Sequence, residues 1–336
     1  MAGIFTDGIA EIRPGTYFNV NTNDGSKVIG AKDGIVGVLF QGTFGPLNEV
    51  VKLTADQGAF PIFGDGGNVD AIEYAFLGGA DTVLAVRVGA EGTEATVQLG
   101  EIVTIKGKYP GSREFSVSVK NSLTDSAKKE ISFYSGSRRM ESYVIAKSTD
   151  KEGAALAEAM KKSPRFTVQV NTDGQLEPVS QKAFTAGTDP AATVEDYSKG
   201  LEKLENQYMN VLCVDTENPA VHLLLKTFLD RAYDNGLFTC GIVAELSSQT
   251  LEERIANALT YNDEKMIYLL NAHVGMLEKE LDGYQTAAIA AGMYASYPSN
   301  KALTHKILPG VSELKEVLTP SQMESAETKG CMVLSN

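Results

Sequence analysis

The fold is decided by Met209-Asn-Val-Leu-Cys-Val214 and Leu237-Phe-Thr-Cys-Gly-Ile-Val-Ala244, two short apolar runs that are separated by a helical pattern over residues 220–234. A second helical pattern, over residues 251–259, leads to a third apolar run, Lys265-Met-Ile-Tyr-Leu-Leu270. Short apolar runs that alternate with helices are typical of parallel strands buried on both faces. This half of the chain is therefore predicted to form a doubly wound α/β sheet.

The same alternation occurs near the start of the chain. The apolar run Ile35-Val-Gly-Val-Leu-Phe40 is followed by a helical pattern over residues 68–77 and by a second run, Asp81-Thr-Val-Leu-Ala-Val-Arg-Val88. Asn68 is expected to cap the N-terminus of this helix, and Gly78-Gly79 to end it. These elements are predicted to form a parallel βαβ unit of the same sheet.

Residues 92–186 differ from their surroundings in pattern and in charge. Runs such as Glu114-Phe-Ser-Val-Ser-Val-Lys120 alternate apolar and polar residues, which is typical of antiparallel strands with one face in water. This segment has 14 basic and 11 acidic residues, whereas the rest of the chain has 16 basic and 32 acidic ones. We therefore expect an antiparallel β-rich domain inserted into a doubly wound core domain. The predicted division is an N-terminal arm (1–24), the first part of the core (25–91), the insertion (92–186), the second part of the core (187–322) and a helix end with a C-terminal arm (323–336).

Both ends of the chain carry β-prone segments that have no evident partner nearby in the sequence. Such terminal strands can extend the sheet of another chain by pairing with its edge. Folding of both strands onto their own subunit is the alternative. The candidate inter-subunit strands consist of Tyr17, Phe18, Asn19, Val20 and Asn21 at one end and of Cys331, Met332, Val333 and Leu334 at the other.

The composition excludes several classes of protein. The 336 residues are 43% hydrophobic and 22% charged, as in an ordinary globular protein. A net charge of −13 disfavours binding to nucleic acid or to an anionic lipid surface. We find neither a signal-peptide pattern nor 18 uninterrupted apolar residues, so a cytoplasmic protein without a membrane span is expected. The three cysteines do not suggest a disulfide framework.

A search for catalytic chemistry yields few candidates. His222, His273 and His305 lie in separate predicted elements and lack the spacing of a zinc site. We find no nucleotide-binding loop and no nucleophile elbow, so no catalytic residue, metal or cofactor is predicted. Asp215 and Glu245 follow two predicted parallel strands, at the end where α/β enzymes bind their ligands. An enzyme with a crevice at these two carboxylates is the alternative function, although Asp215-Thr-Glu-Asn218 also fits a cap before the helix expected at Ala220.

Several segments, in order, resemble one protein family. Pro14-Gly-Thr-Tyr-Phe-Asn-Val20 and Gly34-Ile-Val-Gly-Val-Leu-Phe-Gln-Gly-Thr-Phe-Gly-Pro-Leu-Asn48 resemble the first two blocks of contractile phage tail sheath proteins. Ile105-Lys-Gly-Lys-Tyr-Pro-Gly-Ser-Arg113 is similar to the start of the family's insertion, except that Glu114 replaces a glycine, and Phe184-Thr-Ala-Gly-Thr-Asp189 is similar to its end. Further similar segments are Phe60-Pro-Ile-Phe-Gly64, Asp81-Thr-Val-Leu-Ala-Val-Arg-Val88, Ala287-Ala-Ile-Ala-Ala-Gly-Met-Tyr294 and Tyr297-Pro-Ser-Asn300.

The resemblance implies a sheath of the short type found in Gram-positive prophages and in phage-tail-like bacteriocins. It implies sixfold helical rings of identical subunits around an inner tail tube, linked by terminal arms that add strands to a partner's sheet. It also implies contraction from a high-energy extended state, with baseplate and tail terminator proteins as further partners. Assembly is expected in the bacterial cytoplasm, as part of a virion or of an extracellular tail-like particle.

The resemblance further places an element near the C-terminal helix against the tube. The candidate tube contacts are Glu316, Glu324, Glu327 and Lys329, although an exposed helix face gives the same pattern. Family members have a longer C-terminal arm than the run that ends at Asn336, so the arm is expected to be short or truncated. The sequence leaves open whether the particle is a phage, a bacteriocin or a secretion-type machine.

Overall fold

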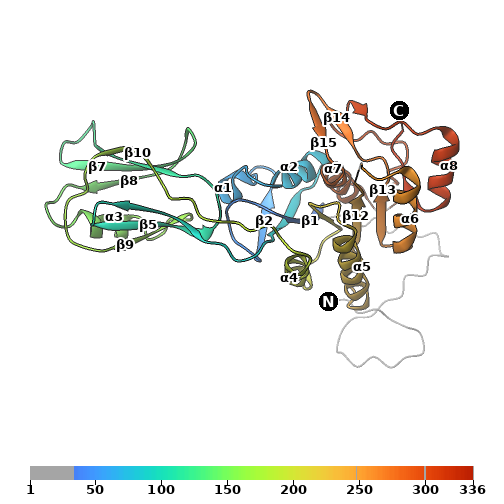
Figure 1. Ribbon diagram of the computed structural model, residues 1–336, viewed down its shortest axis with the longest axis horizontal. Coiled ribbons are helices and arrows are strands. Elements are labelled where there is room, and N and C mark those ends of the chain that lie inside the picture. The colour runs from blue at the N-terminus through green and yellow to red at the C-terminus, as the bar shows by residue number, and fades with distance from the viewer. Residues whose placement is uncertain (1–33, 247, 299, 336) are drawn as a thin grey trace.

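The computed structural model describes residues 34–246, 248–298 and 300–335 of the chain. The molecule is elongated, with a β-rich region (residues 94–184) at one end and an α/β region (residues 34–88 and 194–335) at the other (Figure 1). The candidate strand Tyr17–Asn21 lies outside the described residues, so its pairing stays a prediction.

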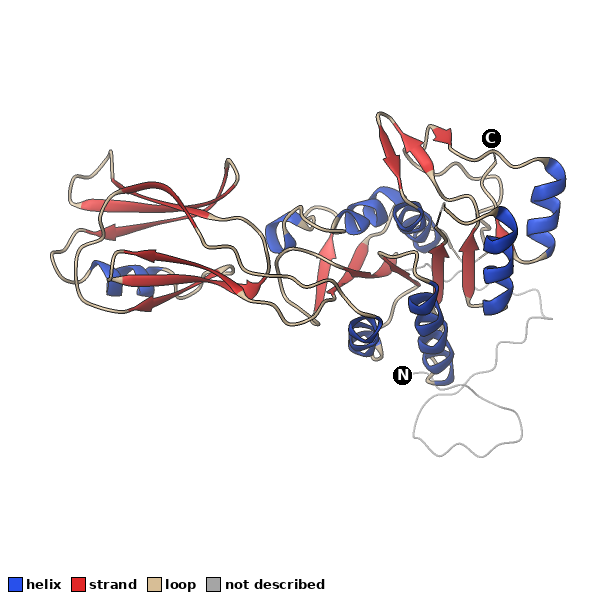
Figure 2. Cartoon of the chain, in the orientation of Figure 1, coloured by secondary structure: helices blue, strands red, loops and turns tan. Residues whose placement is uncertain are grey.

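The α/β region is built on a seven-stranded sheet. Every neighbouring pair is parallel except β2 and β3, and Figure 2 shows the parallel strands side by side. In spatial order the strands are β17 (Cys331–Met332), β13 (Met266–Leu269), β12 (Cys240–Ala244), β11 (Val211–Val214), β1 (Ile35–Phe40), β3 (Thr82–Arg87) and β2 (Val50–Thr54).

Helices pack on both faces of this sheet because alternate residues of its strands point to opposite sides. On β1, Val36 and Val38 lie in one apolar cluster and Leu39 lies in the other. The first cluster also includes side chains of α2 (Asp70–Gly78) and α7 (Gly283–Ser296). The second includes side chains of α4 (Val194–Leu204), α5 (Pro219–Asp234), α6 (Leu251–Tyr261) and α8 (Pro320–Thr328).

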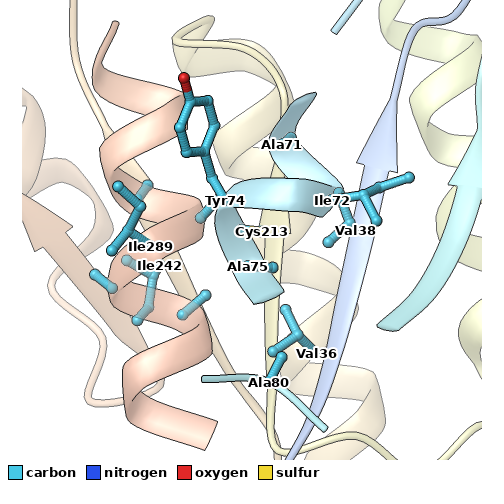
Figure 3. Close-up of a cluster of buried hydrophobic side chains, with 14 of the residues drawn as sticks. Val36, Val38, Ala71, Ile72, Tyr74, Ala75, Ala80, Cys213, Ile242 and Ile289 are labelled. Carbon is cyan, nitrogen blue, oxygen red and sulfur yellow. The ribbon is translucent and has the colours of Figure 1, made fainter. Parts of the chain in front are cut away.

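Helices α2 and α7 touch through glycine. A Cβ on Gly292 would lie 2.0 Å from the Ala75 carbonyl oxygen, and a Cβ on Gly78 would lie 2.1 Å from that of Ile289. Figure 3 shows α2, where Ala75 is labelled, beside α7, where Ile289 is labelled, and it shows Ile72 next to Val38 of β1. The run of alanine and glycine in α7 thus permits an approach of two helices that no larger residue allows.

The β-rich region has its own apolar core between two antiparallel sheets. Phe115, Phe133, Phe166 and Phe184 meet at its centre, with Phe133 and Phe166 stacked at 4.6 Å between ring centroids. One sheet contains β4 (Glu94–Leu99), β5 (Val103–Pro110) and β9 (Phe166–Val170); the other contains β10 (Val179–Ala183), β6 (Ser116–Asn121), β7 (Lys128–Ser135) and β8 (Arg138–Ala146).

A buried ion pair fixes α3 (Glu152–Ala159) to this region. The Lys129 ammonium donates to Glu152 at 2.8 Å and to the Leu176 carbonyl at 2.6 Å. Glu152 also accepts from the backbone N–H groups of Ser148 and Leu176, and both charged side chains are buried. All partners of the pair thus come from different segments of the β-rich region.

Arginine side chains hold the β-rich region against the α/β region. The buried Arg87 guanidinium donates to the carbonyls of Gly42 and Gly45 on one side and of Pro110 on the other, at 2.7–2.9 Å. Arg113, also buried, lies over the Phe60 ring of the short helix α1 (Phe60–Phe63) at 5.0 Å from its centroid. The junction therefore consists of specific contacts and not only of two connecting segments.

The predicted α/β class is confirmed, and most predicted elements appear near their expected bounds. The expected cap at Asn68 is wrong: α2 begins at Asp70, its N-cap residue is Val69, and the Asn68 side chain instead donates to Asp215. A third small sheet, composed of β14 (Val274–Met276), β15 (Lys279–Leu281) and β16 (Glu313–Leu314), was not predicted.

Candidate functional site

The C-terminal strand lies at one edge of the large sheet. Cys331 and Met332 of β17 pair in parallel with Tyr268 and Leu269 of β13. Beyond β17, the Asn271 side chain accepts from the backbone N–H of Leu334 and donates to its carbonyl, both at 2.8 Å. Residues 331 and 332 thus pair with a strand about sixty residues earlier in their own chain, as in the alternative stated above, and the exchange of residues 331–334 between subunits stays a prediction.

The four candidate tube-contact residues do not form one patch. Glu324 and Glu327 are exposed on α8, and Lys329 is exposed at its C-cap. Glu316 lies before that helix and forms an ion pair with the buried Arg254 of α6, at 2.7 Å. Glu316 therefore fixes the segment before α8, and only the other three point outward without an ion pair among the described residues.

Two hollows lie beside α6. One, of about 290 Å³, separates α6 from α8 and has an apolar floor that includes Leu251, Ile255 and Leu259. The other, of about 370 Å³, lies near the start of β13 and is lined by polar and aromatic side chains that include Tyr261 and Tyr268. Lys329 borders both hollows, which therefore adjoin the C-terminal edge of the sheet.

Asp215, one of the two carboxylates at the strand ends, is committed to structural hydrogen bonds. It accepts from the backbone N–H of Gln41 at 2.6 Å, from the Asn68 amide at 2.9 Å and from the Tyr197 hydroxyl. Burial raises the pKa of Asp215, and the side chain is only 2% exposed. The helix cap expected in the segment from Asp215 to Asn218 is confirmed, with Asn218 as the N-cap residue of α5.

The second carboxylate, Glu245, belongs to a buried cluster that the sequence did not reveal. The Nδ1 atom of His222 lies 3.7 Å from Glu245, and the Nε2 atom of His273 lies 3.6 Å from Glu217. Burial raises the pKa of Glu217 to about 7, and the backbone N–H groups of Gly283 and Tyr284 at the start of α7 oppose this rise. Gly283 leaves room for this contact, because a Cβ there would lie 2.6 Å from the Glu217 oxygen.

The cluster ties the loops after β11, β12 and β13 to the start of α7. Neither described hollow has Asp215, Glu217 or Glu245 in its lining. Among the described residues, no three His, Cys, Asp or Glu side chains are arranged to hold a metal ion. The same part of the chain contains no helix long and apolar enough to cross a membrane. The polar groups at the strand ends thus hold neighbouring loops together. The sheet edge and the hollows beside α6 and α8 are the surfaces that stay accessible.

Comparison with known proteins gives a family match for the C-terminal part of the chain. Residues 191–336 match the family described as the phage tail sheath protein central domain. The uncharacterized protein YqbK of Bacillus subtilis strain 168 is 24% identical over 247 residues, which is 69% of this chain and 52% of the relative. The chain thus spans about half the length of this curated relative.

Two solved structures share the fold along nearly the whole chain. The sheath tail protein of Desulfitobacterium hafniense gives a TM-score of 0.75 at 19% identity, over 96% of this chain and 72% of that one. The sheath tail protein Lin1278 of Listeria innocua gives a TM-score of 0.71 at 22% identity, over 90% of this chain and 65% of that one. The match of residues 191–336 to the sheath central domain confirms the resemblance found in the sequence for this part of the chain, and the two solved structures share its fold.

Proposed function

We propose that this chain is the structural subunit of a contractile tail sheath. Copies polymerise in sixfold helical rings around a tail tube, exchange terminal strands, and contract from a high-energy extended state to drive the tube through a cell envelope. The match of residues 191–336 to the sheath central domain carries this proposal. The partners are copies of the chain, the tube protein, and baseplate and tail terminator proteins, assembled in the bacterial cytoplasm into a phage or bacteriocin particle.

The edge of the large sheet supports strand exchange. Only Tyr268 and Leu269 of β13 are paired by β17, and within the described residues no strand pairs with the outer side of β17. Unpaired backbone groups at a sheet edge are able to receive a strand from another chain. We assign Tyr17–Asn21 and residues 331–334 to this exchange.

The division of the chain into domains is part of the same proposal. A doubly wound core from residues 25–91 and 187–322 carries residues 92–186 as an outer insertion. The separate apolar clusters of the two regions support this division. The outward residues Glu324, Glu327 and Lys329 remain the proposed tube contact, with Glu316 holding the segment that leads to them.

We propose no enzymatic role. In the alternative, Asp215 and Glu245 line a crevice for a small ligand. Both side chains are at most 2% exposed, and Asp215 accepts three hydrogen bonds from the protein itself. These contacts favour a structural role over substrate binding.

Deletion of residues 1–22 tests strand exchange directly. We expect the variant to keep its far-ultraviolet circular dichroism and to form no tubes by electron microscopy. Leu123→Ser is a suitable control, since Leu123 is fully exposed in the β-rich region, and it should form tubes like the parent chain. Loss of the circular dichroism signal in the deletion variant would show that the arm belongs to its own subunit.

Electron microscopy of particles from the source cells, with mass identification of their proteins, tests the sheath itself. The proposal requires this chain as an abundant component of rods that occur in a long narrow and a short wide form. Rods that lack the chain would contradict it, and turnover of a small ligand that depends on Asp215 or Glu245 would favour the alternative.

A further inference from the structure

Three aromatic side chains gather on the surface at the amino end of the large sheet. Tyr208 precedes β11 and is 51% exposed, Phe238 precedes β12 and is 59% exposed, and Tyr233 at the end of α5 is 40% exposed. Phe238 and Tyr233 pack edge to face, 5.0 Å apart between centroids. Single exposed apolar residues are ordinary, whereas a contiguous group of them marks a surface that something covers. We call these three residues the aromatic patch.

The patch lies beside the point where the first 33 residues join the fold. The Asn210 side chain accepts from the backbone N–H of Ile35, the first residue of β1, and donates to the Tyr208 hydroxyl. The register places Val36 beside Val211 of β11, and Val211 beside Cys240 of β12. Strands in a sheet lie about 5 Å apart, so β11 and β12 lie within about 10 Å of β1.

The position of Gly34 fixes the point where the preceding segment joins the described fold. Gly34 has a φ of +65°, and its carbonyl accepts from the backbone N–H groups of Asp81 and Thr82. Residues 28 and 29 precede it by six and five positions, so they reach at most about 20 Å from it. The stretch Lys27-Val-Ile-Gly-Ala-Lys-Asp33 contains the apolar pair Val28-Ile29, whose tether to Gly34 is long enough to reach the patch.

Charged residues lie beside the aromatic patch and on both sides of the pair Val28-Ile29. Asp234, next to Tyr233, is exposed and has no ion pair among the described residues. Lys27 and Lys32 flank the pair Val28-Ile29. Lys265, whose Nζ lies 5.6 Å from the centroid of the Tyr233 ring, also borders the patch, so its rim carries both signs of charge and the proposed contact depends on its apolar centre.

We propose that Val28 and Ile29 dock on the aromatic patch of their own subunit and anchor the root of the N-terminal segment. The segment that precedes this anchor then begins at a fixed place on the sheet. This inference concerns the single subunit and holds whether or not copies of the chain form a sheath.

Because the sequence contains no tryptophan, a single introduced tryptophan can report on this contact without background emission from others. Ile29→Trp introduces a single tryptophan at the proposed anchor, and Ser26→Trp introduces a control before it. We expect the Trp emission of Ile29→Trp to lie at shorter wavelength than that of Ser26→Trp and to be quenched less by acrylamide. Both are measured at concentrations where the chain is monomeric. Adding Tyr208→Ser and Phe238→Ser should shift this emission to that of the control.

Limited proteolysis tests the same contact without a tryptophan. Trypsin should cut after Lys27 and Lys32 more slowly in the parent chain than in the Tyr208→Ser/Phe238→Ser variant, with unchanged circular dichroism in both. Equal cutting rates, or equal quenching of the two tryptophan variants, would overturn the proposal. Shielding that is lost on dilution to the monomer would overturn it too, because the occupant would then be a second copy.

Discussion

The β-rich region and the α/β region differ in how their sheets end. In the β-rich region, Thr96 and Thr185 exchange backbone hydrogen bonds of 2.9 and 2.7 Å between the two sheets, and α3 packs against β8 and β9. In the α/β region, β2 and the two-residue β17 form open sheet edges within the described part of the chain. Open edges invite pairing with other chains, whereas covered edges prevent it. Within the described part of the chain, the α/β region therefore offers open sheet edges for pairing, whereas β4, β8 and β9 of the β-rich region have further contacts.

The two regions also differ in the residues that hold them together. The α/β region depends on the close glycine contact between α2 and α7, and the β-rich region depends on clustered phenylalanines and one buried ion pair. The glycine contact and the ion pair each lie within a single region, whereas Phe44 of the α/β region joins the phenylalanine cluster. Substitutions at the glycine contact and at the ion pair should therefore affect one region and spare the other.

The largest effect is expected from Lys129→Met in the β-rich region. The change leaves Glu152 buried without its cation, which costs about 3–5 kcal/mol of unfolding free energy. Lys161→Met is the matched control: its partner Glu158 is 77% exposed, and such a surface pair contributes about 0–1 kcal/mol. Urea unfolding gives the free energies, and hydrogen exchange should increase in residues 94–184 alone. Faster exchange throughout both regions would contradict their independence.

Gly292→Ala should affect the α/β region by a smaller amount. The added methyl collides with the Ala75 carbonyl and separates α7 from α2, and such overpacking costs about 1–3 kcal/mol. Ala256→Ser, on the exposed side of α6, serves as the control. Hydrogen exchange monitored by mass spectrometry should increase in α2, α7 and the neighbouring strands. An unchanged urea midpoint would show that the two helices do not meet as described.

The pH dependence of stability should report on Glu217. Its folded-state pKa of about 7 is above the ordinary value of 4.5, so the folded protein holds the proton more tightly than the unfolded chain does. The resulting stabilisation is complete below pH 4.5 and is lost as the pH rises through 7, by roughly 1 kcal/mol between pH 6 and 8.

Glu217→Gln should remove this loss, and Glu324→Gln, which removes the same charge from the exposed face of α8, should retain it. Thermal unfolding of the three proteins across this pH range measures the difference. Parallel profiles for the parent chain and Glu217→Gln would contradict the role of Glu217.

The smallest effect is expected from Thr250→Ala at the start of α6. The Thr250 hydroxyl accepts from the backbone N–H of Glu253, whose carboxylate bonds back to Thr250. Loss of this exposed capping box should cost about 0.5–1 kcal/mol. Thr250→Ser keeps the hydroxyl and should restore the urea midpoint. Equal midpoints for the Ala variant and the parent chain would show that the cap contributes nothing.

Local patterns in the sequence predicted much of the fold. The strand Ile35–Phe40 has the bounds expected from its apolar run, because burial on both faces leaves a clear signal. The cap at Asn68 failed for a tertiary reason: its side chain bonds to Asp215, 147 positions away. A local sequence pattern gives no sign that Asp215 competes with the helix N-terminus for the Asn68 side chain.

The buried polar cluster could be predicted only from the order of the strands in the sheet. His222, Glu245 and His273 are far apart in the sequence and meet only because β11, β12 and β13 are neighbours with their carboxyl ends aligned. That arrangement was a usable signal for Asp215 and Glu245, which the sequence did place at the strand ends. The partner of Cys331 and Met332 was missed for the same reason, since β13 lies about sixty residues earlier.

The arginine junction has a mechanical consequence. Because one Arg87 side chain bonds to carbonyls of Gly42 and Gly45 on one side and Pro110 on the other, rotation of the β-rich region about its two connecting segments requires these bonds to break together. A torque applied to the outer end of the molecule is therefore transmitted to the large sheet. The guanidinium group of Arg87, together with that of Arg113, thus makes the elongated molecule stiff at the junction of its two regions.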